Sequence, residues 1–188
     1  MRVIAGEFRS RQLKTIPGLA TRPTPDRLRE TLFDILQAQI EGVTFMDAYA
    51  GTGAVGIEAL SRGAKQAYFL ERSRPALEAI RANLSTLDLD SRGIVIPGPV
   101  LKTITGIRAD VVFLDPPYDA QNEYAAVLEL IGTAPPRLTI AQHSVRVELP
   151  QQSGDLRRTR VVKQGDNALS FYTPAPTIAT PPEPPTQP

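Results

Sequence analysis

The sequence predicts an α/β fold with a mostly parallel β-sheet that ends in an antiparallel hairpin. Short apolar runs alternate with helix-like segments from Val43 onward, which is the pattern of repeated strand, helix, strand units. Two apolar runs, residues 43–46 and 111–114, are each followed by an acidic residue where a buried strand would end. The last third changes to strand-like runs around the turn residues Gly165-Asp166-Asn167.

Length and composition favour a single domain over residues 1–173. A chain of 188 residues can bury about 70% of its unfolded surface around one core. The absence of cysteine and the single histidine, His143, argue against disulfides, thiolate zinc sites and Ser-His-Asp catalysis, so we expect no metal site. No apolar run approaches the roughly 18 residues that span a bilayer, and the first residues lack a signal-peptide pattern. We therefore expect a cytoplasmic monomer without membrane contact.

Positive charge concentrates at the start of the chain. Residues 1–29 carry a net charge of +5, whereas the remaining residues sum to −4. A basic segment on a mildly acidic body indicates a polyanionic partner, because phosphate contacts supply much of the affinity for nucleic acids. The alternative is a solvated segment with no partner. The candidate RNA-binding residues are Arg2, Arg9, Arg11, Arg22 and Arg27.

The first elements are a basic hairpin and a helix. Residues 1–20 contain β-like pieces at 3–4 and 12–14, which predict a short hairpin before the main domain. Thr24-Pro25-Asp26 offers an N-cap, a proline at the first helical position and an acidic first turn. The helix that follows has one apolar face, formed by Leu28, Leu32, Ile35 and Leu36.

The remaining elements follow in order. The expected strands cover residues 43–46, 67–70, 94–96, 109–114, 137–141, 156–163 and 168–172. The expected helices cover residues 54–62, a segment beginning after Ser73, and 124–131. Residues 174–188 contain seven prolines and almost no apolar side chains, so they predict a disordered tail. A role as a proline-rich ligand is the alternative for this tail.

The segment after the first strand resembles a nucleoside-cofactor loop. Gly51-Thr52-Gly53-Ala54-Val55-Gly56, with Glu71 twenty residues after Gly51, also matches a dinucleotide fingerprint. Asp47 at the strand end would repel a pyrophosphate, but it favours the cationic end of S-adenosylmethionine (SAM). The glycines allow close approach of the backbone, and Glu71 can accept both ribose hydroxyls. A glycine-rich turn beside a solvated acid is the structural alternative. The candidate cofactor residues are Asp47, Tyr49, Ala50, Gly51, Thr52, Gly53, Glu71 and Arg72.

A second segment, Asp115-Pro116-Pro117-Tyr118, suits a planar amine. The prolines restrict the backbone, so the Asp115 carboxylate and the Pro116 carbonyl become neighbouring hydrogen-bond acceptors for an NH₂ group. Tyr118 supplies a stacking face for a nucleobase. Catalysis would consist mainly of positioning, with Asp115 favouring the positive charge that develops on nitrogen. The alternative is a turn with a half-buried aromatic residue.

Together these residues resemble the SAM-dependent methyltransferases of the RsmD type, which methylate the guanine N2 amine in 16S ribosomal RNA. The resemblance extends to about Tyr172. It rests on Arg2–Gly6, Arg22-Pro23-Thr24, Arg27–Phe33, Asp47–Gly53, Glu58–Ala64, Glu71, Asp115–Tyr118 and Leu169–Tyr172. It implies a class I methyltransferase sheet, a Rossmann-like fold with a reversed hairpin at its edge. It also implies a bacterial enzyme acting on the small ribosomal subunit.

The chain departs from the family pattern at three places. Pro97–Val100 lacks the acid that the family usually has near the cofactor adenine, and Gln142 and Gln164 replace an acid and a tyrosine. Two other functions therefore stay open. An adenine-N6 methyltransferase shares the Pro-Pro-aromatic pattern, although it normally begins with asparagine. A nonenzymatic RNA-binding assembly factor would keep the fold without efficient cofactor use.

Overall fold

A computed structural model describes residues 1–16, 26–117 and 122–176 of the chain. The residues that would cap the first helix, Thr24 and Pro25, lie outside this part. In chain order the elements are α1 (Asp26–Leu36), β1 (Thr44–Ala48), α2 (Ala54–Ser61), β2 (Gln66–Glu71), α3 (Arg74–Thr86), β3 (Gly93–Pro97), α4 (Val100–Thr103), the 3₁₀ helix η1 (Ile104–Gly106), β4 (Val111–Leu114), α5 (Glu123–Gly132), β5 (Leu138–Ser144), β6 (Gln152–Ser153), β7 (Leu156–Gln164) and β8 (Asn167–Pro174).

One eight-stranded sheet organises these elements, in the order β3-β2-β1-β4-β5-β8-β7-β6. The strands β3, β2, β1, β4 and β5 pair in parallel. The strands β8, β7 and β6 continue the sheet in antiparallel pairs. The predicted Rossmann-like α/β fold with an antiparallel C-terminal hairpin is therefore confirmed.

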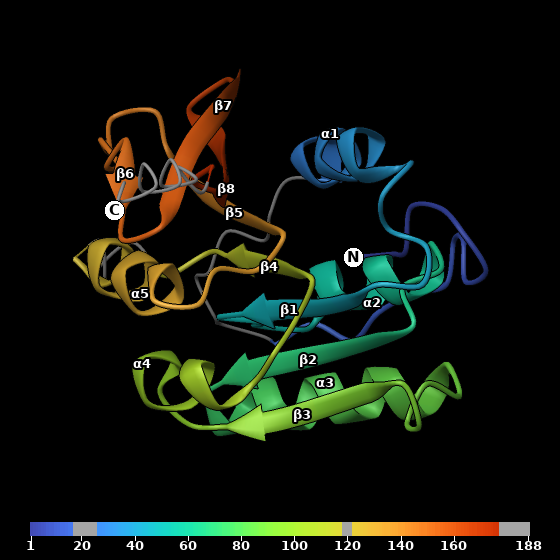
Figure 1. The fold of residues 1–188 in the computed structure, drawn as a ribbon. Helices are drawn as coiled ribbons and strands as arrows, with labels where there is room; N and C mark the ends of the chain where they lie inside the picture. Colours follow the sequence, from blue (N-terminus) through green and yellow to red (C-terminus); the bar gives the residue numbers. More distant parts are fainter. Residues whose placement is uncertain (17–25, 118–121, 177–188) are drawn as a thin grey trace, which may run out of the picture.

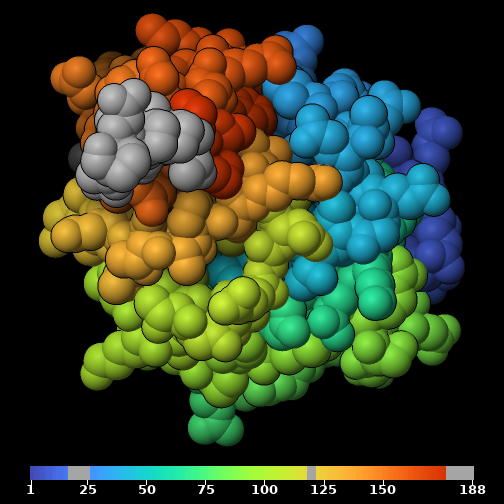
Figure 2. Space-filling model, viewed as in Figure 1, coloured from blue at the N-terminus to red at the C-terminus, as the bar shows by residue number. Residues whose placement is uncertain are grey.

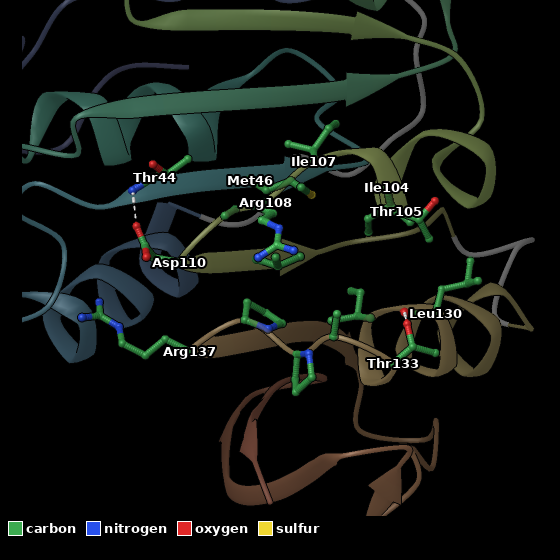
Figure 3. Close-up of a pocket in the computed structure, with 16 residues that line it drawn as sticks. Thr44, Met46, Ile104, Thr105, Ile107, Arg108, Asp110, Leu130, Thr133 and Arg137 are labelled. Carbon is green, nitrogen blue, oxygen red and sulfur yellow. Dashed lines mark hydrogen bonds between the residues drawn. The ribbon is translucent and has the colours of Figure 1, made fainter.

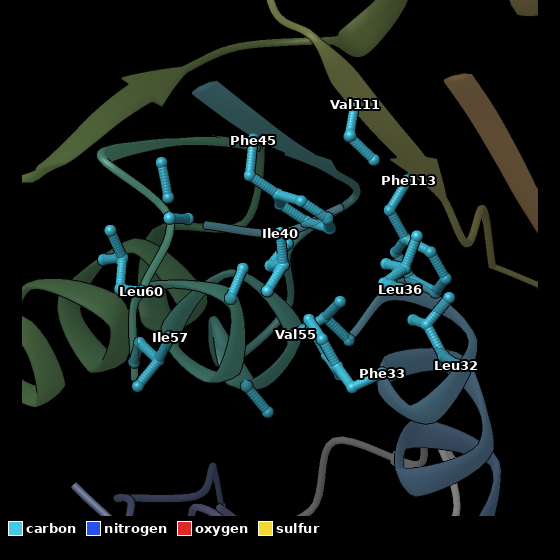
Figure 4. Close-up of a cluster of buried hydrophobic side chains, with 14 of the residues drawn as sticks. Leu32, Phe33, Leu36, Ile40, Phe45, Val55, Ile57, Leu60, Val111 and Phe113 are labelled. Atoms are coloured by element: carbon cyan, nitrogen blue, oxygen red, sulfur yellow. The ribbon is translucent and has the colours of Figure 1, made fainter. Parts of the chain in front are cut away.

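Helices cover both faces of the parallel part of the sheet (Figure 1). All four residues of β4 are buried, because a parallel strand with helices on both sides meets water on neither face. Phe45, Val111 and Phe113 join a core cluster with α1 and α2. Figure 4 shows the side chains of Leu32 and Phe33 from α1 gathered on this side. The alternate strand residues pack against α4 and α5 in a second cluster.

The strand order reverses at β1. The chain runs from β1 outward through β2 to β3, then crosses back to β4 on the other side of β1 and continues to β5. The carboxyl ends of β1 and β4 are neighbours, since Ala48 pairs with Leu114. Open α/β sheets bind ligands at such a switch point. The fold therefore positions the two motifs, which begin at Asp47 and Asp115, at one crevice.

The N-terminal segment is held firmly to α2. The fully buried carboxylate of Glu58 accepts hydrogen bonds from the backbone N–H groups of Ile4 (2.8 Å) and Ala5 (3.0 Å) and from Nε of Arg62 (2.8 Å). The Ser61 hydroxyl donates to the Ala5 carbonyl and accepts from the Phe8 N–H. Residues 1–16 are thus a packed part of the domain and not a loose arm.

The N-terminal segment does not form regular strands. Residues 1–13 turn back on themselves through a single antiparallel bridge between Arg2 and Gln12. Backbone hydrogen bonds from Val3 to Arg11 (3.0 Å) and from Leu13 to the carbonyl of Met1 (2.9 Å) close the turn. The expected hairpin is therefore present only as this bridged turn, because several of its backbone N–H groups bond to α2 and α3 instead of to a partner strand.

The chain's ordered end lies slightly beyond the expected boundary at residue 173. Pro174 is the last residue of β8 and lies opposite Leu156. The N–H of Ala175 donates to the carbonyl of Asp155 at 2.6 Å. Placing Pro174 and Ala175 in a disordered tail is thus wrong, because a proline at the end of a strand needs no donor of its own. Residues 177–188 of the expected tail lie outside the described residues.

Two further features complete the description of the fold. No helix within the described ranges is long and apolar enough to cross a membrane. The short elements α4, η1 and β6 were not expected from the sequence, because each has too few residues to show a periodic pattern.

Replacing Glu58 by alanine should destabilise the fold by about 3–5 kcal/mol, because it leaves three donors and the Arg62 charge without their partner. Urea denaturation followed by circular dichroism measures this loss. The matched control is Glu78→Ala, which removes an exposed carboxylate paired with Arg74 on α3 and should cost about 0–1 kcal/mol. Equal losses in both variants would show that Glu58 does not hold the N-terminal segment.

Candidate functional site

The candidate site lies at the carboxyl ends of β1, β2 and β4. Asp47 is the fourth residue of β1, Glu71 ends β2, and Asp115 follows directly after β4. Ala48 pairs with Leu70 and with Leu114, so the three carboxyl groups lie at neighbouring strand ends. The charges of Asp115 and Glu71 accordingly raise the pKa of Asp47. The structure therefore unites the cofactor residues and the base-binding residues that the sequence singled out.

Asp47 is almost fully buried beneath the first turn of α2. Its Oδ2 accepts a hydrogen bond from the N–H of Gly56 at 2.8 Å, which lowers its pKa. Burial is the larger effect and, with the charges of Asp115 and Glu71, raises the pKa well above its ordinary value. This carboxyl group is thus maintained at a cost in stability, which is typical of functional sites.

Glu71 organises the backbone around the crevice. Its Oε2 accepts from the N–H of Gly51 (2.8 Å), and its Oε1 accepts from the N–H groups of Arg72 and Ser73 (2.8 Å each). The cofactor loop is thereby fixed to the start of α3. Ser73 is the N-cap of α3 and makes no side-chain capping hydrogen bond, and its own N–H donates to Glu71. The side chain of Arg72 is exposed beside it.

The two glycines of the loop have different surroundings. Both have positive φ angles, 56° for Gly51 and 78° for Gly53. A Cβ built on Gly51 meets no atom within 4 Å, whereas one built on Gly53 lies 3.2 Å from Ile80 and 3.3 Å from Phe69. Gly51 is therefore the position where the backbone is open to a ligand. Gly53 permits close packing against Ile80 and Phe69, and its expected role in cofactor binding stays a prediction.

Tyr49 connects the cofactor loop to α5. Its hydroxyl donates to Oε2 of Glu123 at 2.6 Å, and burial together with this carboxylate raises its pKa. Tyr49 has a φ of 69°, a left-handed conformation that costs a non-glycine residue about 1–2 kcal/mol. Such strain is concentrated at functional sites. The N–H groups of Tyr49 and Ala50 both donate to the carbonyl of Leu70, which anchors the loop on β2.

The candidate base-binding segment, residues 115–118, is described as far as its second proline. Asp115 and Pro117 are half-buried and Pro116 is buried, so the segment is fixed where it leaves the sheet. Tyr118 lies outside the described residues. Gln142 on β5 is the next neighbour, because Leu114 pairs with the residue before it, Ala141.

A buried amide that the sequence analysis missed links the cofactor loop to the N-terminal segment. Asn83 of α3 donates to the carbonyls of Thr52 (3.1 Å) and Lys14 (3.2 Å), and its Oδ1 accepts from the Lys14 N–H (2.7 Å). The hydroxyl of Thr52 also lies 3.9 Å from the sulfur of Met1. The sequence signal for Asn83 was a lone polar residue on the apolar face of α3.

The structure disperses the candidate RNA-binding residues. Arg2, Arg9, Arg11 and Arg27 are all exposed, and Arg22 lies outside the described residues. The turn that carries Arg9 packs against Ser61, at the end of α2 about 12 Å from the cofactor loop. Arg11 donates to the carbonyl of Thr86, where α3 ends. Both arginines are therefore nearer the amino ends of the strands than the crevice.

A separate hollow of about 660 Å³ lies on the flank of the sheet, between η1 and α5. Figure 2 shows it as a gap between yellow-green and gold residues, and Figure 3 shows Met46 on its floor and Arg108 within it. Thr44, which begins β1, and Asp110, which precedes β4, mark its position at the amino ends of the strands. The hollow is therefore distinct from the candidate site.

His143 lies in the sheet, on strand β5. The ring of His143 lies between the Ser144 carbonyl and the Ser170 hydroxyl, at 2.8 Å from each, and burial lowers its pKa. These contacts fix β5 to β8 and indicate a structural role. Within the described ranges, no three His, Cys, Asp or Glu side chains are grouped so that they could hold a metal ion.

Comparison with known proteins assigns the chain to a family. A family model described as "Conserved hypothetical protein 95" matches residues 1–173. The chain belongs to this family. The putative rRNA methyltransferase YlbH of Bacillus subtilis is 36% identical over 183 residues, which cover 92% of this chain and 98% of that protein.

Two further relatives support the assignment to this methyltransferase family. Ribosomal RNA small subunit methyltransferase D of Haemophilus influenzae is 40% identical over 123 residues, 63% of this chain and 64% of that protein. The solved structure of the putative methyltransferase yhhF from Escherichia coli superimposes with a TM-score of 0.80 at 30% identity, covering 93% of this chain and 98% of that one. The resemblance to RsmD-type methyltransferases is thus confirmed.

Asp47→Asn should stabilise the protein at neutral pH. The raised pKa of Asp47 means that its contribution to stability is complete below its unfolded pKa and is lost as the pH rises through its folded pKa. Asparagine keeps an acceptor for Gly56 but carries no charge. We expect thermal unfolding to show a Tm gain of about 2–4 °C for each kcal/mol relieved, growing with pH above about 4. A difference that stays constant with pH would contradict this account.

Alanine at Gly51 and at Gly53 should have different effects. Both substitutions cost about 1–2 kcal/mol of backbone strain at positive φ. Gly53→Ala should lose additional stability through contact with Ile80 and Phe69, whereas Gly51→Ala should mainly lose cofactor affinity. Denaturation and calorimetric titration with SAM, run on both variants, measure the two effects. The assignment of Gly51 to the ligand side is wrong if its variant binds SAM as the wild type does.

Proposed function

We propose that this protein transfers a methyl group from SAM to the exocyclic N2 amine of a guanine in 16S ribosomal RNA of the small subunit. The observation that carries the proposal is the convergence of the Gly51 loop, Glu71 and Asp115 at the carboxyl ends of β1, β2 and β4. The family relatives include proteins named as rRNA and small-subunit rRNA methyltransferases, which agrees with RNA as the substrate.

The charge of the crevice suits SAM better than a dinucleotide. Four carboxyl groups, those of Asp47, Glu71, Asp115 and Glu123, belong to the residues at the carboxyl ends of the strands and the start of α5. Such a site repels a pyrophosphate but favours a cationic ligand. When bound, SAM supplies an electrophilic methyl group on a cationic sulfur. We assign its binding to Asp47, Tyr49, Ala50, Gly51, Thr52, Glu71 and Arg72, with Gly53 in support.

Three backbone donors already occupy most of the acceptor capacity of Glu71. A carboxylate has about four lone-pair sites, and the N–H groups of Gly51, Arg72 and Ser73 use three. A bound ribose would therefore share Glu71 with the loop, so cofactor binding and loop position depend on one side chain. Pro97, which pairs opposite Glu71, and Gly98, whose N–H donates to its carbonyl, form the adjoining wall.

The choice of base follows from the chemistry of Asp115. Guanine presents an amine beside a protonated N1, which are adjacent donors, whereas adenine presents an amine beside an acceptor. A carboxylate offers only acceptors and complements guanine. Asp115 and the Pro116 carbonyl would orient the amine, the Asp115 charge would favour the positive charge developing on nitrogen, and Pro117 would fix the backbone. Tyr118 completes the proposed catalytic set through its stacking face.

The direct test uses labelled SAM and small ribosomal subunits from cells that lack this gene. We expect label on one guanine, in a form that yields N2-methylguanine on digestion. Label on an adenine amine would support the adenine-N6 alternative. Calorimetric titration without detectable SAM binding would favour the nonenzymatic assembly factor.

Asp115→Asn should keep SAM affinity and lower guanine methylation by about ten- to a hundredfold, the cost of one unmatched polar pair of about 1–3 kcal/mol. The amide places a donor opposite the N1 proton and removes the counter-charge. Single-turnover rates on small subunits, with SAM affinity measured in parallel, test this prediction. A wild-type rate would show that Asp115 does not accept the amine.

A further inference from the structure

Strand β7 carries a concentration of positive charge that the sequence analysis did not assign to RNA. It contains four basic residues and no acidic residue in nine positions. Arg157, Arg160 and Lys163 are exposed, and none of them forms an ion pair with an acid in the described part of the chain. A row of uncompensated cations attracts a polyanion.

The fourth basic residue of the strand, Arg158, has a structural role. Its guanidinium donates to the carbonyl of Leu149 at 2.9 Å and to Oε1 of Gln151 at 3.2 Å and 3.3 Å. These bonds tie the connection after β5 to β7. Because Arg158 makes this connection, the other three basic residues of β7 are not needed to hold the segment after β5.

The register of the sheet places β7 within reach of the candidate site. Leu114, directly before Asp115, pairs with Ala141; Ala141 pairs with Ser170, and Ser170 pairs with Val161. Three strand spacings therefore separate β7 from β4, a lateral distance of about 14 Å. Nucleotides next to a base held at Asp115 can span this distance, because consecutive residues of a nucleic acid each carry a phosphate.

Helix α1 extends the same surface. The hydroxyl of Thr31 bonds to Oε1 of Gln164 at 3.3 Å, which brings α1 beside the carboxyl end of β7. Arg27 lies one turn before Thr31 on the same face of the helix, and its side chain is exposed. The guanidinium of Arg160 lies over the ring of Phe171, 5.8 Å from its centroid, on the side of the sheet that α1 covers.

We infer that Arg157 and Arg160, which lie on the face of β7 toward α1, together with Arg27, bind RNA phosphates that flank the target guanine. This inference rests on the proposed function, and it moves the main RNA contact away from the turn that carries Arg9. Each long side chain can reach a phosphate while its strand stays in the sheet, so binding requires no rearrangement of the core.

A competing role follows from the position of β7 near the edge of the sheet. Among the residues that the structure describes, β6 pairs with Leu156 and Arg157, and the rest of β7 has no strand partner on its outer side. Cations on such a strand also prevent pairing with another chain. The two roles give different experimental results, because phosphate binding by these cations affects RNA affinity and protection of the strand edge does not.

The test compares two double variants that each remove two positive charges. Arg157→Gln with Arg160→Gln alters β7, and Arg74→Gln with Arg81→Gln alters exposed positions of α3 as the control. For a single-stranded RNA oligonucleotide, the slope of log K against log salt should fall by about 1.4 in the β7 variant and remain unchanged in the control. With small ribosomal subunits, the β7 variant should show a higher KM, with kcat and SAM affinity unchanged.

A wild-type salt slope in the β7 variant overturns the inference. If this variant also self-associates in analytical ultracentrifugation, the cations instead protect the strand. An equal fall of the salt slope in both double variants would likewise overturn the inference, because it would reflect the net charge of the protein alone. The proposed function has a separate test: it is wrong if the wild-type protein transfers no label from SAM to the RNA of the subunits.

Discussion

Parallel pairing of β1 with both β2 and β4 is the constraint on which the rest of the structure depends. This pairing leaves three strand ends side by side, at Ala48, Leu70 and Leu114. Residues 47–53, Glu71 and Asp115 are far apart in the sequence, yet they meet because each follows or ends one of these strands. The helices on both faces bury the strands, so the site rests on a rigid support and needs few contacts of its own.

The crevice places negative charges where access to water is limited, and this lowers the stability of the folded state. Asp47 is tolerated because the N–H of Gly56 partly compensates its charge, and Glu71 because three backbone N–H groups bond to it. The strained backbone of Tyr49 adds to this cost. A cationic ligand relieves the repulsion among these groups. The site therefore favours binding of such a ligand over a neutral or anionic one.

The N-terminal segment has a structural role that its charge did not indicate. Glu58 and Ser61 hold it against α2, and Asn83 joins it to the cofactor loop through Lys14 and Thr52. The segment is thus part of the support of the site. Other exposed cations lie on α1 and β7, two elements that a contact between Thr31 and Gln164 brings together.

The sequence by itself determined the fold class, the order of the main strands and the two motifs of the site. These features depend on local patterns, such as the apolar run before Asp115 and the glycines after Asp47. Only the tertiary structure decided that Gly53 packs against Ile80 and Phe69 while Gly51 faces open space, and that Glu123 holds Tyr49.

Tertiary structure also decided where charge accumulates. The net charge along the sequence predicted that residues 1–29 contact a polyanion. Whether a basic side chain faces a ligand depends, however, on the element against which it packs. The register places Arg160 of β7 in line with Phe171, Ile140 and Phe113, so Arg160 lies three strands across from the end of β4. In the sequence 44 residues lie between Asp115 and Arg160, and no local pattern reveals the pairing. Pairings between distant strands arise from packing of the whole sheet, and a local pattern carries no information about them.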